Sequence, residues 1–160
     1  MSKKRLPEPE ALNSVKAFHE LFEMPVLEQP KIPSSERCAL RVSLLQEELN
    51  ELKQAIEDHD LVEIADALSD LQYVLSGAIL EFGLGERFKA LFDEVQRSNM
   101  SKACATIEEA EATRKYYKEA RNTDSYIRQK GDEYLVFREG DSKVLKSVKY
   151  SPADLSKFLK

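Results

Sequence analysis

The sequence has few of the residues that build disulfides, zinc sites or membrane spans. It contains two cysteines, Cys38 and Cys104, which lie far apart and belong to no CxxC pair or Cys/His cluster. This spacing argues against a zinc site. No apolar run approaches the roughly 20 residues that cross a bilayer, and the N-terminus carries no apolar signal-peptide segment. We therefore expect a cytoplasmic protein without a membrane partner.

The chain also lacks an excess of positive charge. It has 29 Asp and Glu against 24 Lys and Arg, which gives a net charge of −5 and disfavours nucleic acid as the main partner. Hydrophobic residues make up 42%, so the chain is not disordered. A length of 160 residues suffices for one core with an appendage. We expect a main domain over residues 1–122 and a small one over 123–160.

What the sequence does contain is a succession of amphipathic patterns. Apolar residues recur at spacings of three and four through several segments, which is typical of helices with one buried face. The predicted helices span residues 7–24, 35–58, 61–82, 86–97 and 106–121. β-rich runs on either side of Gly140-Asp141 predict a hairpin within 134–150. Ser151-Pro152 predicts a last short helix over 153–159.

Two acidic clusters lie on the second and third predicted helices. Carboxylates at positions i, i+3 and i+4 share a helix face, and each like-charge pair there costs about 0.2–0.5 kcal/mol. The short break between the two helices makes them antiparallel neighbours, so their acidic stripes can face each other. Repeating this repulsion on both helices indicates a cation site. The clusters are EELNE, with Glu47, Glu48 and Glu51, and EIADALSD, with Glu63, Asp66 and Asp70.

Clusters of oxygen ligands select hard cations. Mg²⁺ prefers octahedral oxygen ligands and keeps several waters, so we expect Mg²⁺, with Mn²⁺ as a substitute. The absence of histidine near the clusters argues against zinc or a di-iron centre. Phosphate oxygens could fill the open metal positions, and a spare carboxylate could deprotonate the attacking water.

The ordered segments EELNE, EIADALSDLQYVLSG, GLG and FDEVQRSNMSK resemble the MazG-like all-α nucleoside triphosphate pyrophosphohydrolases. This superfamily includes dimeric dUTPases and phosphoribosyl-ATP pyrophosphohydrolases. The resemblance covers residues 12–104, and the tail GDSKVLKSVKYSPADL is similar to that of some members. It implies an antiparallel four-helix bundle core and a homodimer or homotetramer. It also implies hydrolysis between the α and β phosphates of an NTP or dNTP, giving the monophosphate and pyrophosphate.

The resemblance assigns roles to individual residues. Glu48 and Glu51 would be Mg²⁺ ligands, with Glu47 as a further ligand or the water-activating base. In the second cluster Asp70 matches the Asp of an ExxD motif, but Ala67 stands at the Glu position. Asp66 could replace that Glu, or Glu63 and Asp66 could form an ExxD one turn earlier. SNMSK resembles the segment that closes over the nucleotide, so Asn99 and Lys102 would contact phosphate or base, with Arg97 as a further phosphate donor. Tyr73, on the third predicted helix, is a further candidate for substrate contact.

Two rival interpretations stay open. The acids could be solvated helix faces, or a structural cation site, in a non-catalytic helical oligomeric module. Ala67 favours this alternative. Alternatively, Lys143, Lys146 and Lys149 on the predicted hairpin could serve a nucleic-acid accessory protein, although the acidic balance argues against it.

Overall fold

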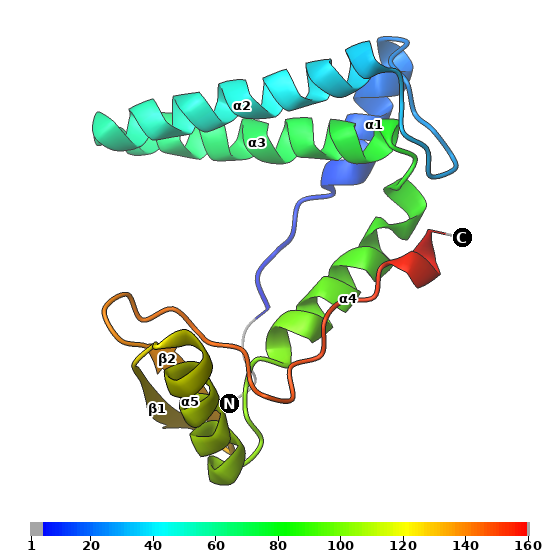
Figure 1. Cartoon of the computed structure of the whole chain (residues 1–160). Coiled ribbons are helices and arrows are strands. Elements are labelled where there is room, and N and C mark those ends of the chain that lie inside the picture. Colours follow the sequence, from blue (N-terminus) through cyan, green and yellow to red (C-terminus); the bar gives the residue numbers. More distant parts are fainter. Residues whose placement is uncertain (1–4, 160) are drawn as a thin grey trace. The chain divides into compact units, whose positions relative to one another are not determined.

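A computed structural model describes residues 5–159 and shows a mostly helical chain with one small β-hairpin. Its elements, shown in Figure 1, are α1 (Ala11–Leu21), α2 (Ser35–Glu57), α3 (Leu61–Glu81), η1 (Gly85–Arg87), α4 (Phe88–Met100), α5 (Ile107–Arg121), β1 (Ser125–Lys130), β2 (Glu133–Arg138) and η2 (Ser156–Phe158). Contacts divide the chain after Phe88 into an N-terminal unit and a C-terminal unit. None of the described helices has the length and apolar character needed to cross a membrane.

The antiparallel pair of α2 and α3 dominates the N-terminal unit, and α1 packs against α3. Both long helices have capped N-termini. The Ser34 hydroxyl accepts the Arg37 N–H at 3.4 Å, and the Asp60 carboxylate accepts the N–H groups of Val62 and Glu63. The confirmed break at His59 and Asp60 is short, so the two helices run side by side with opposite directions.

The segment before α2 is tied to the end of α3 by backbone hydrogen bonds. The Leu27 N–H donates to the Leu80 carbonyl at 3.0 Å, and the Lys31 N–H donates to the Phe82 carbonyl at 3.1 Å. Gly83, just beyond α3, has φ +68°, and a Cβ there would lie 1.9 Å from the Gln29 carbonyl oxygen. Only glycine fits both this backbone conformation and this approach.

In the C-terminal unit, α5 packs on the hairpin of β1 and β2. A small core holds α5 and the hairpin to the segments before α5 and after β2. Its buried residues are Cys104, Ala110, Val136 and Leu145. Cys104 and Tyr134 exchange backbone hydrogen bonds of 2.8 and 2.9 Å, which attach the segment before α5 to β2. The expected helix over residues 106–121 is confirmed, and Thr106 caps it by accepting the Glu109 N–H.

The expected hairpin within residues 134–150 is wrong in its position. The ladder pairs Ser125–Lys130 with Glu133–Arg138 around Gly131, whose φ of +62° suits the first residue of a two-residue type II′ turn. The chain does turn again at Gly140, but it makes one isolated bridge, Phe137 to Val144. Beyond Leu145 it leaves β2, because the Ser147 N–H donates to the Lys102 carbonyl instead.

Two further expectations about architecture differ from the structure. The last helix expected over 153–159 is only the single 3₁₀ turn Ser156–Phe158, since Asp154 uses its carboxylate on the Ser156 N–H and hydroxyl. A four-helix bundle is not confirmed, because within the described residues α1–α3 form one unit and nearly all of α4 belongs to the other. The expected domains 1–122 and 123–160 stay a prediction.

Candidate active site

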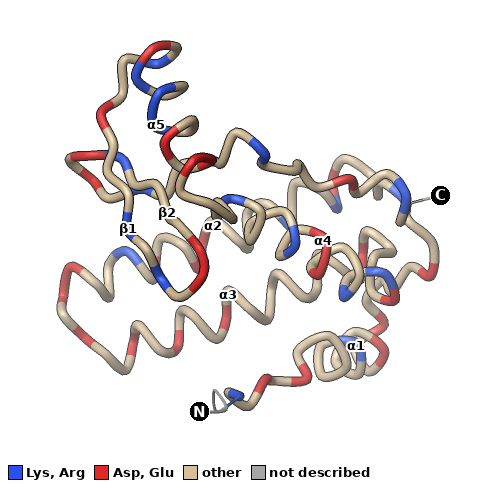
Figure 2. The backbone as a smooth tube through the Cα atoms, turned by 90° about the horizontal axis from the view of Figure 1, so that it is seen from below, with Lys and Arg blue, Asp and Glu red and all other residues tan. Residues whose placement is uncertain are grey.

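The register of α2 against α3 brings the two acidic clusters toward each other. The Arg37 Nε donates to a Glu81 carboxylate oxygen at 3.0 Å and fixes one end of the pair. Counting eleven residues along each helix from this contact toward the α2–α3 connection leads to Glu48 on α2 and Asp70 on α3. Counting fourteen residues leads to Glu51 and Ala67. Figure 2 shows the resulting series of acidic positions, coloured red, along α3.

Glu48 is the member of the clusters that turns inward. Its side chain is half-buried, and its Oε2 atom is buried without a hydrogen-bond partner among the described residues. Burial, followed by the carboxylates of Glu51 and Asp70, raises the pKa of Glu48; Glu47 and Asp66 add to this increase. A carboxylate placed this way is destabilised by its surroundings, and residues 5–159 supply it with no cationic partner.

The other acids stay in contact with solvent. The exposed members are Glu47, Glu51, Glu63, Asp66 and Asp70. Within residues 5–159, no three Asp, Glu, His or Cys side chains lie close enough together to hold a metal ion. The donor set nevertheless fits a hard cation, because it contains only carboxylate oxygens and one of them is buried without a partner. Ala67 is 3% exposed and adds no oxygen to this set.

Tyr73 borders a cavity on the same unit. The cavity has a volume of about 440 Å³ and lies between α1 and α3, where Val15, Leu68, Ser69 and Gln72 also line it. The Tyr73 ring meets the Phe18 ring edge-on at 5.7 Å, and 39% of Tyr73 is exposed. Tyr73 stands three residues after Asp70, so it shares a helix side with the acidic stripe.

The remaining predicted substrate residues belong to the C-terminal unit. Arg97 donates to both oxygens of Glu94, at 2.8 and 2.9 Å, and to the Ser151 hydroxyl and the Pro152 carbonyl, each at 3.0 Å. With the Asp154 N–H, it lowers the pKa of Glu94 to about 2. Most Arg97 donors are therefore used within the chain, in attaching the tail to α4.

Asn99 and Lys102 form a pair close to the end of α4. The Lys102 ammonium donates to the Asn99 side-chain oxygen at 2.8 Å. Lys102 is half-buried, whereas Asn99 is exposed. The structure therefore brings these two predicted residues together, and their contact with a nucleotide stays a prediction.

A buried charge network beside the acidic clusters was not predicted from the sequence. Glu81 is 1% exposed and accepts hydrogen bonds from Arg37 and Arg41, and Arg41 is 4% exposed. Burial is the largest single influence on Glu81 and would raise its pKa, but Arg41 and Arg37 together outweigh it, so the pKa is lowered. The buried His19 lies beside this network, with its Nδ1 2.9 Å from the Pro25 carbonyl oxygen.

This network left a weak signal in the sequence. Arg41 falls between Cys38 and Leu45 on the inner stripe of α2, and Glu81 ends an otherwise apolar turn of α3. An arginine and a glutamate that both face inward on antiparallel neighbouring helices predict a buried ion pair, because a buried charge needs a partner.

Comparison with known proteins identifies the family of the segment that contains the acidic clusters. Residues 15–99 match the family Phosphoribosyl-ATP pyrophosphohydrolase (PRA-PH), and this segment contains both acidic clusters and more than half of the chain. No curated protein matches the chain. The chain therefore belongs to the phosphoribosyl-ATP pyrophosphohydrolase family of the MazG-like superfamily, a family of hydrolases that act on phosphoric anhydrides.

Proposed function

We propose that the protein is an Mg²⁺-dependent pyrophosphohydrolase that cleaves an NTP or dNTP between the α and β phosphates, releasing the monophosphate and pyrophosphate. The observation that carries this proposal is the buried Oε2 of Glu48, which has no partner among the described residues and faces further carboxylates. Such a group is stabilised by a divalent cation, which offsets both the burial and the carboxylate repulsion that raise its pKa. Family membership supports the reaction class.

Four carboxylates would hold the metal in this proposal: Glu48, Glu51, Asp66 and Asp70. Bound Mg²⁺, or Mn²⁺ in its place, would neutralise charge on the phosphate oxygens and orient them. Glu47 is exposed beside Glu48 and would accept the proton of the attacking water. Glu63, in the first turn of α3, remains the alternative ligand to Asp70, paired with Asp66.

The cavity beside Tyr73 supports a place for the nucleoside. Its lining combines apolar side chains with hydroxyl and amide groups, which suits the face and the edge of a base. We assign phosphate contacts to Arg97, Asn99 and Lys102 on the resemblance of SNMSK to the segment that closes over the nucleotide.

An exposed apolar stripe supports assembly into a homodimer or homotetramer. On α2 it contains Val42, Leu49 and Ile56, and on α3 Leu61, Leu68 and Leu75, all at least 41% exposed. Most residues of this stripe come one position after a residue that faces the other helix. Glu47, Asp66 and Tyr73 instead come one position before such a residue. On antiparallel helices this difference places the stripe and the acidic site on opposite sides.

A second copy would cover that stripe, and two α2–α3 pairs together would form a four-helix arrangement. Leu49→Glu combined with Leu68→Glu should give a monomer in sedimentation equilibrium, because both charges would fall inside the buried interface. Asn50→Glu combined with Ser69→Glu adds the same two negative charges at exposed positions outside the stripe and serves as the control. A wild-type protein that is monomeric at all concentrations would contradict the assembly.

The activity is tested by incubating the protein with a panel of NTPs, dNTPs and phosphoribosyl-ATP, with Mg²⁺ or with EDTA, and separating the products. We expect a monophosphate and pyrophosphate in the Mg²⁺ reactions. Glu48→Gln and Asp70→Asn should lower kcat/KM by about 100-fold or more, and Glu47→Gln should lower kcat by about 100- to 10,000-fold. Glu57→Gln, on an exposed acid of α2 outside the clusters, should leave kcat unchanged.

The same preparation separates the enzyme from a non-catalytic module with a structural cation site. Calorimetric titration with Mg²⁺, with and without a non-hydrolysable NTP, should show tighter metal binding when the nucleotide is present. Equal metal binding in both titrations, together with no product from any nucleotide, would favour the module.

A further inference from the structure

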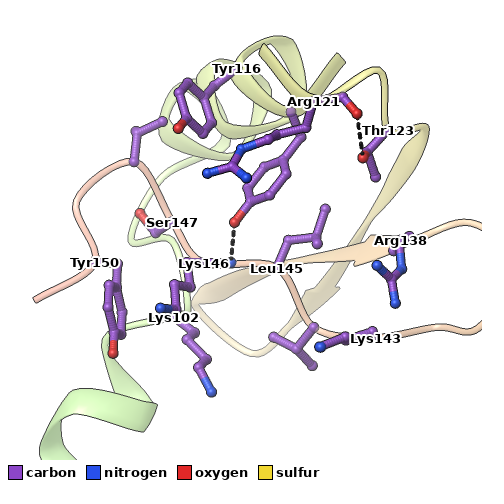
Figure 3. Close-up of a pocket in the computed structure, with 13 residues that line it drawn as sticks. Lys102, Tyr116, Arg121, Thr123, Arg138, Lys143, Leu145, Lys146, Ser147 and Tyr150 are labelled. Carbon is purple, nitrogen blue, oxygen red and sulfur yellow. Dashed lines mark hydrogen bonds between the residues drawn. The ribbon is translucent and has the colours of Figure 1, made fainter. Parts of the chain in front are cut away.

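A second cavity lies wholly inside the C-terminal unit, and its lining is strongly basic. It has a volume of about 900 Å³ and lies between α5, the end of β2 and the tail that follows Gly140 (Figure 3). None of the described residues that line it is acidic. The lining includes five cationic side chains: Lys102, Arg121, Arg138, Lys143 and Lys146.

Several of these cations lack an anionic partner in the part of the chain that the structure describes. Among the described residues, Arg121, Lys143 and Lys146 form no ion pair, whereas Arg138 is engaged with Asp141 and Lys102 with Asn99. The Lys146 ammonium instead lies 4.4 Å from the centre of the Tyr150 ring. Like charges gathered around one cavity repel each other, and a bound anion would remove that cost.

The backbone holds the basic tail in a fixed place. The Leu145 N–H donates to the Val136 carbonyl at 2.8 Å, the Lys146 N–H to the Tyr117 hydroxyl at 3.2 Å and the Val148 N–H to the Thr113 hydroxyl at 3.1 Å. Leu145 is buried, whereas Val144 and Lys146 on either side are exposed toward the cavity. The cationic side chains therefore extend from an ordered strand-like segment, which lowers the entropy lost when they bind a ligand.

The cavity also offers an aromatic wall. Tyr116 lines it, is 47% exposed and meets the Tyr117 ring edge-on at 5.4 Å, so its orientation is supported from one side. Arg121 extends from the end of α5 on the same side of the cavity (Figure 3). An exposed tyrosine ring beside a guanidinium group is suited to stack on a planar base.

The C-terminal unit as a whole is also more basic than the N-terminal unit. Residues 1–88 contain 17 Asp and Glu against nine Lys and Arg, whereas residues 89–160 contain 12 against 15. An acidic unit needs a metal ion to bind phosphate, but the C-terminal unit can attract phosphate without one.

From this combination we propose a second, metal-independent site for a nucleotide. Arg121 and Lys143, with Lys146, bind its phosphate groups, and Tyr116 stacks on its base. All residues that line this cavity lie beyond residue 99, outside the segment matched by the family. Lys102 lines the cavity and also belongs to the proposed catalytic function, but Tyr116, Arg121, Lys143 and Lys146 do not. The proposal rests on these four residues and is therefore independent of that function.

The test is calorimetric titration of the full chain with ATP in the presence of EDTA. We expect saturable binding, weakened about tenfold or more in Arg121→Gln/Lys143→Gln, since two charge-assisted contacts are lost. The matched control is Arg128→Gln/Lys130→Gln, which removes the same charge from β1 outside the cavity and should bind as wild type. Thermal melts of both double variants should match wild type.

Two further titrations define the class of ligand. Tyr116→Ala should weaken ATP binding about tenfold and leave the binding of pyrophosphate unchanged, because only ATP has a base to stack. No ATP binding in EDTA would overturn the proposal. Equal binding by the two double variants would also overturn it, as would an ATP affinity insensitive to Tyr116→Ala. Displacement of ATP by a short single-stranded oligonucleotide that binds more tightly would instead identify nucleic acid as the ligand.

The two proposals fail separately. Glu48→Gln should still bind ATP in EDTA even though its kcat/KM for hydrolysis is lower by about 100-fold or more. If wild type shows no hydrolysis but binds ATP through Arg121 and Lys143, the function proposed above is wrong and the second site stands.

Discussion

At the scale of single residues, Glu48 is held in a position that opposes its own ionisation. Its pKa is raised, so between the ordinary value of 4.5 and that higher value the folded state binds more protons than the unfolded state. Stability of the metal-free protein therefore falls as pH rises through this window, and the penalty is complete once the pH exceeds the raised pKa.

Glu48→Gln should for this reason stabilise the metal-free protein at pH 7 by on the order of 1 kcal/mol, because an unpartnered buried oxygen no longer has to carry charge. At pH 4, below the window, the two proteins should have nearly equal free energies of unfolding. Urea denaturation in EDTA at both pH values measures this difference. A variant that is less stable than wild type at pH 7 would contradict the account of Glu48.

Arg41 shows the opposite situation, a buried charge whose partner is present. Arg41→Ala should lower the free energy of unfolding by about 3–5 kcal/mol, since Glu81 stays buried and loses one of its two arginines. Lys53→Ala, which breaks an exposed pair with Glu57, should change stability by less than about 1 kcal/mol. Denaturant titration of both variants tests the contrast, and equal effects would show that the buried network contributes no more than a surface ion pair.

At the scale of elements, Gly83 connects the end of α3 to the segment before α2. Gly83→Ala should destabilise the protein by more than the about 1–2 kcal/mol that a positive φ costs an alanine, because the added Cβ also meets the Gln29 carbonyl. Gly131→Ala is the matched control: its φ of +62° is similar to the +68° of Gly83, and a Cβ there meets nothing within 4 Å. Similar losses of stability in both variants would mean that the contact between the added Cβ and the Gln29 carbonyl does not lower the free energy of unfolding.

Helical elements were predictable from the sequence because the stripes of apolar residues and the caps act locally. The expected helix over 35–58 and the observed Ser35–Glu57 nearly coincide, and the same holds for 61–82 and Leu61–Glu81. The first strand was missed because SYIRQK is mostly polar, and its pairing partner is set by a turn at Gly131 rather than by its own pattern. The Glu81 network was missed because it depends on the register between two helices.

The candidate site was predictable to a similar degree. The pattern of Glu47, Glu48 and Glu51 indicated a shared helix face, but not that Glu48 alone would turn inward. That distinction depends on which positions α3 covers, and Ala67, opposite Glu51, shows how closely the helices approach there. The tail attachment of Arg97 could not be predicted, since Glu94 and Asp154 lie 60 residues apart in the sequence.

At the scale of the whole molecule, the chain combines two units of opposite charge balance. The N-terminal unit contains the acidic clusters and a cavity between α1 and α3. The C-terminal unit contains the basic cavity, which the family match does not include. The two proposed sites accordingly use different chemistry for phosphate, one through a metal ion and one through cationic side chains.

The positions of the two free cysteines give each unit its own reporter. Cys104 is fully buried in the core of the C-terminal unit, whereas Cys38 is half-buried on α2. A thiol reagent reaches a buried sulfur only when the surrounding structure opens, so labelling rates measure the free energy of local opening. Mass spectrometry of labelled peptides can therefore follow the opening of the two units in one sample. Mg²⁺ bound at the acidic clusters should slow labelling of Cys38, and ATP in EDTA should slow labelling of Cys104.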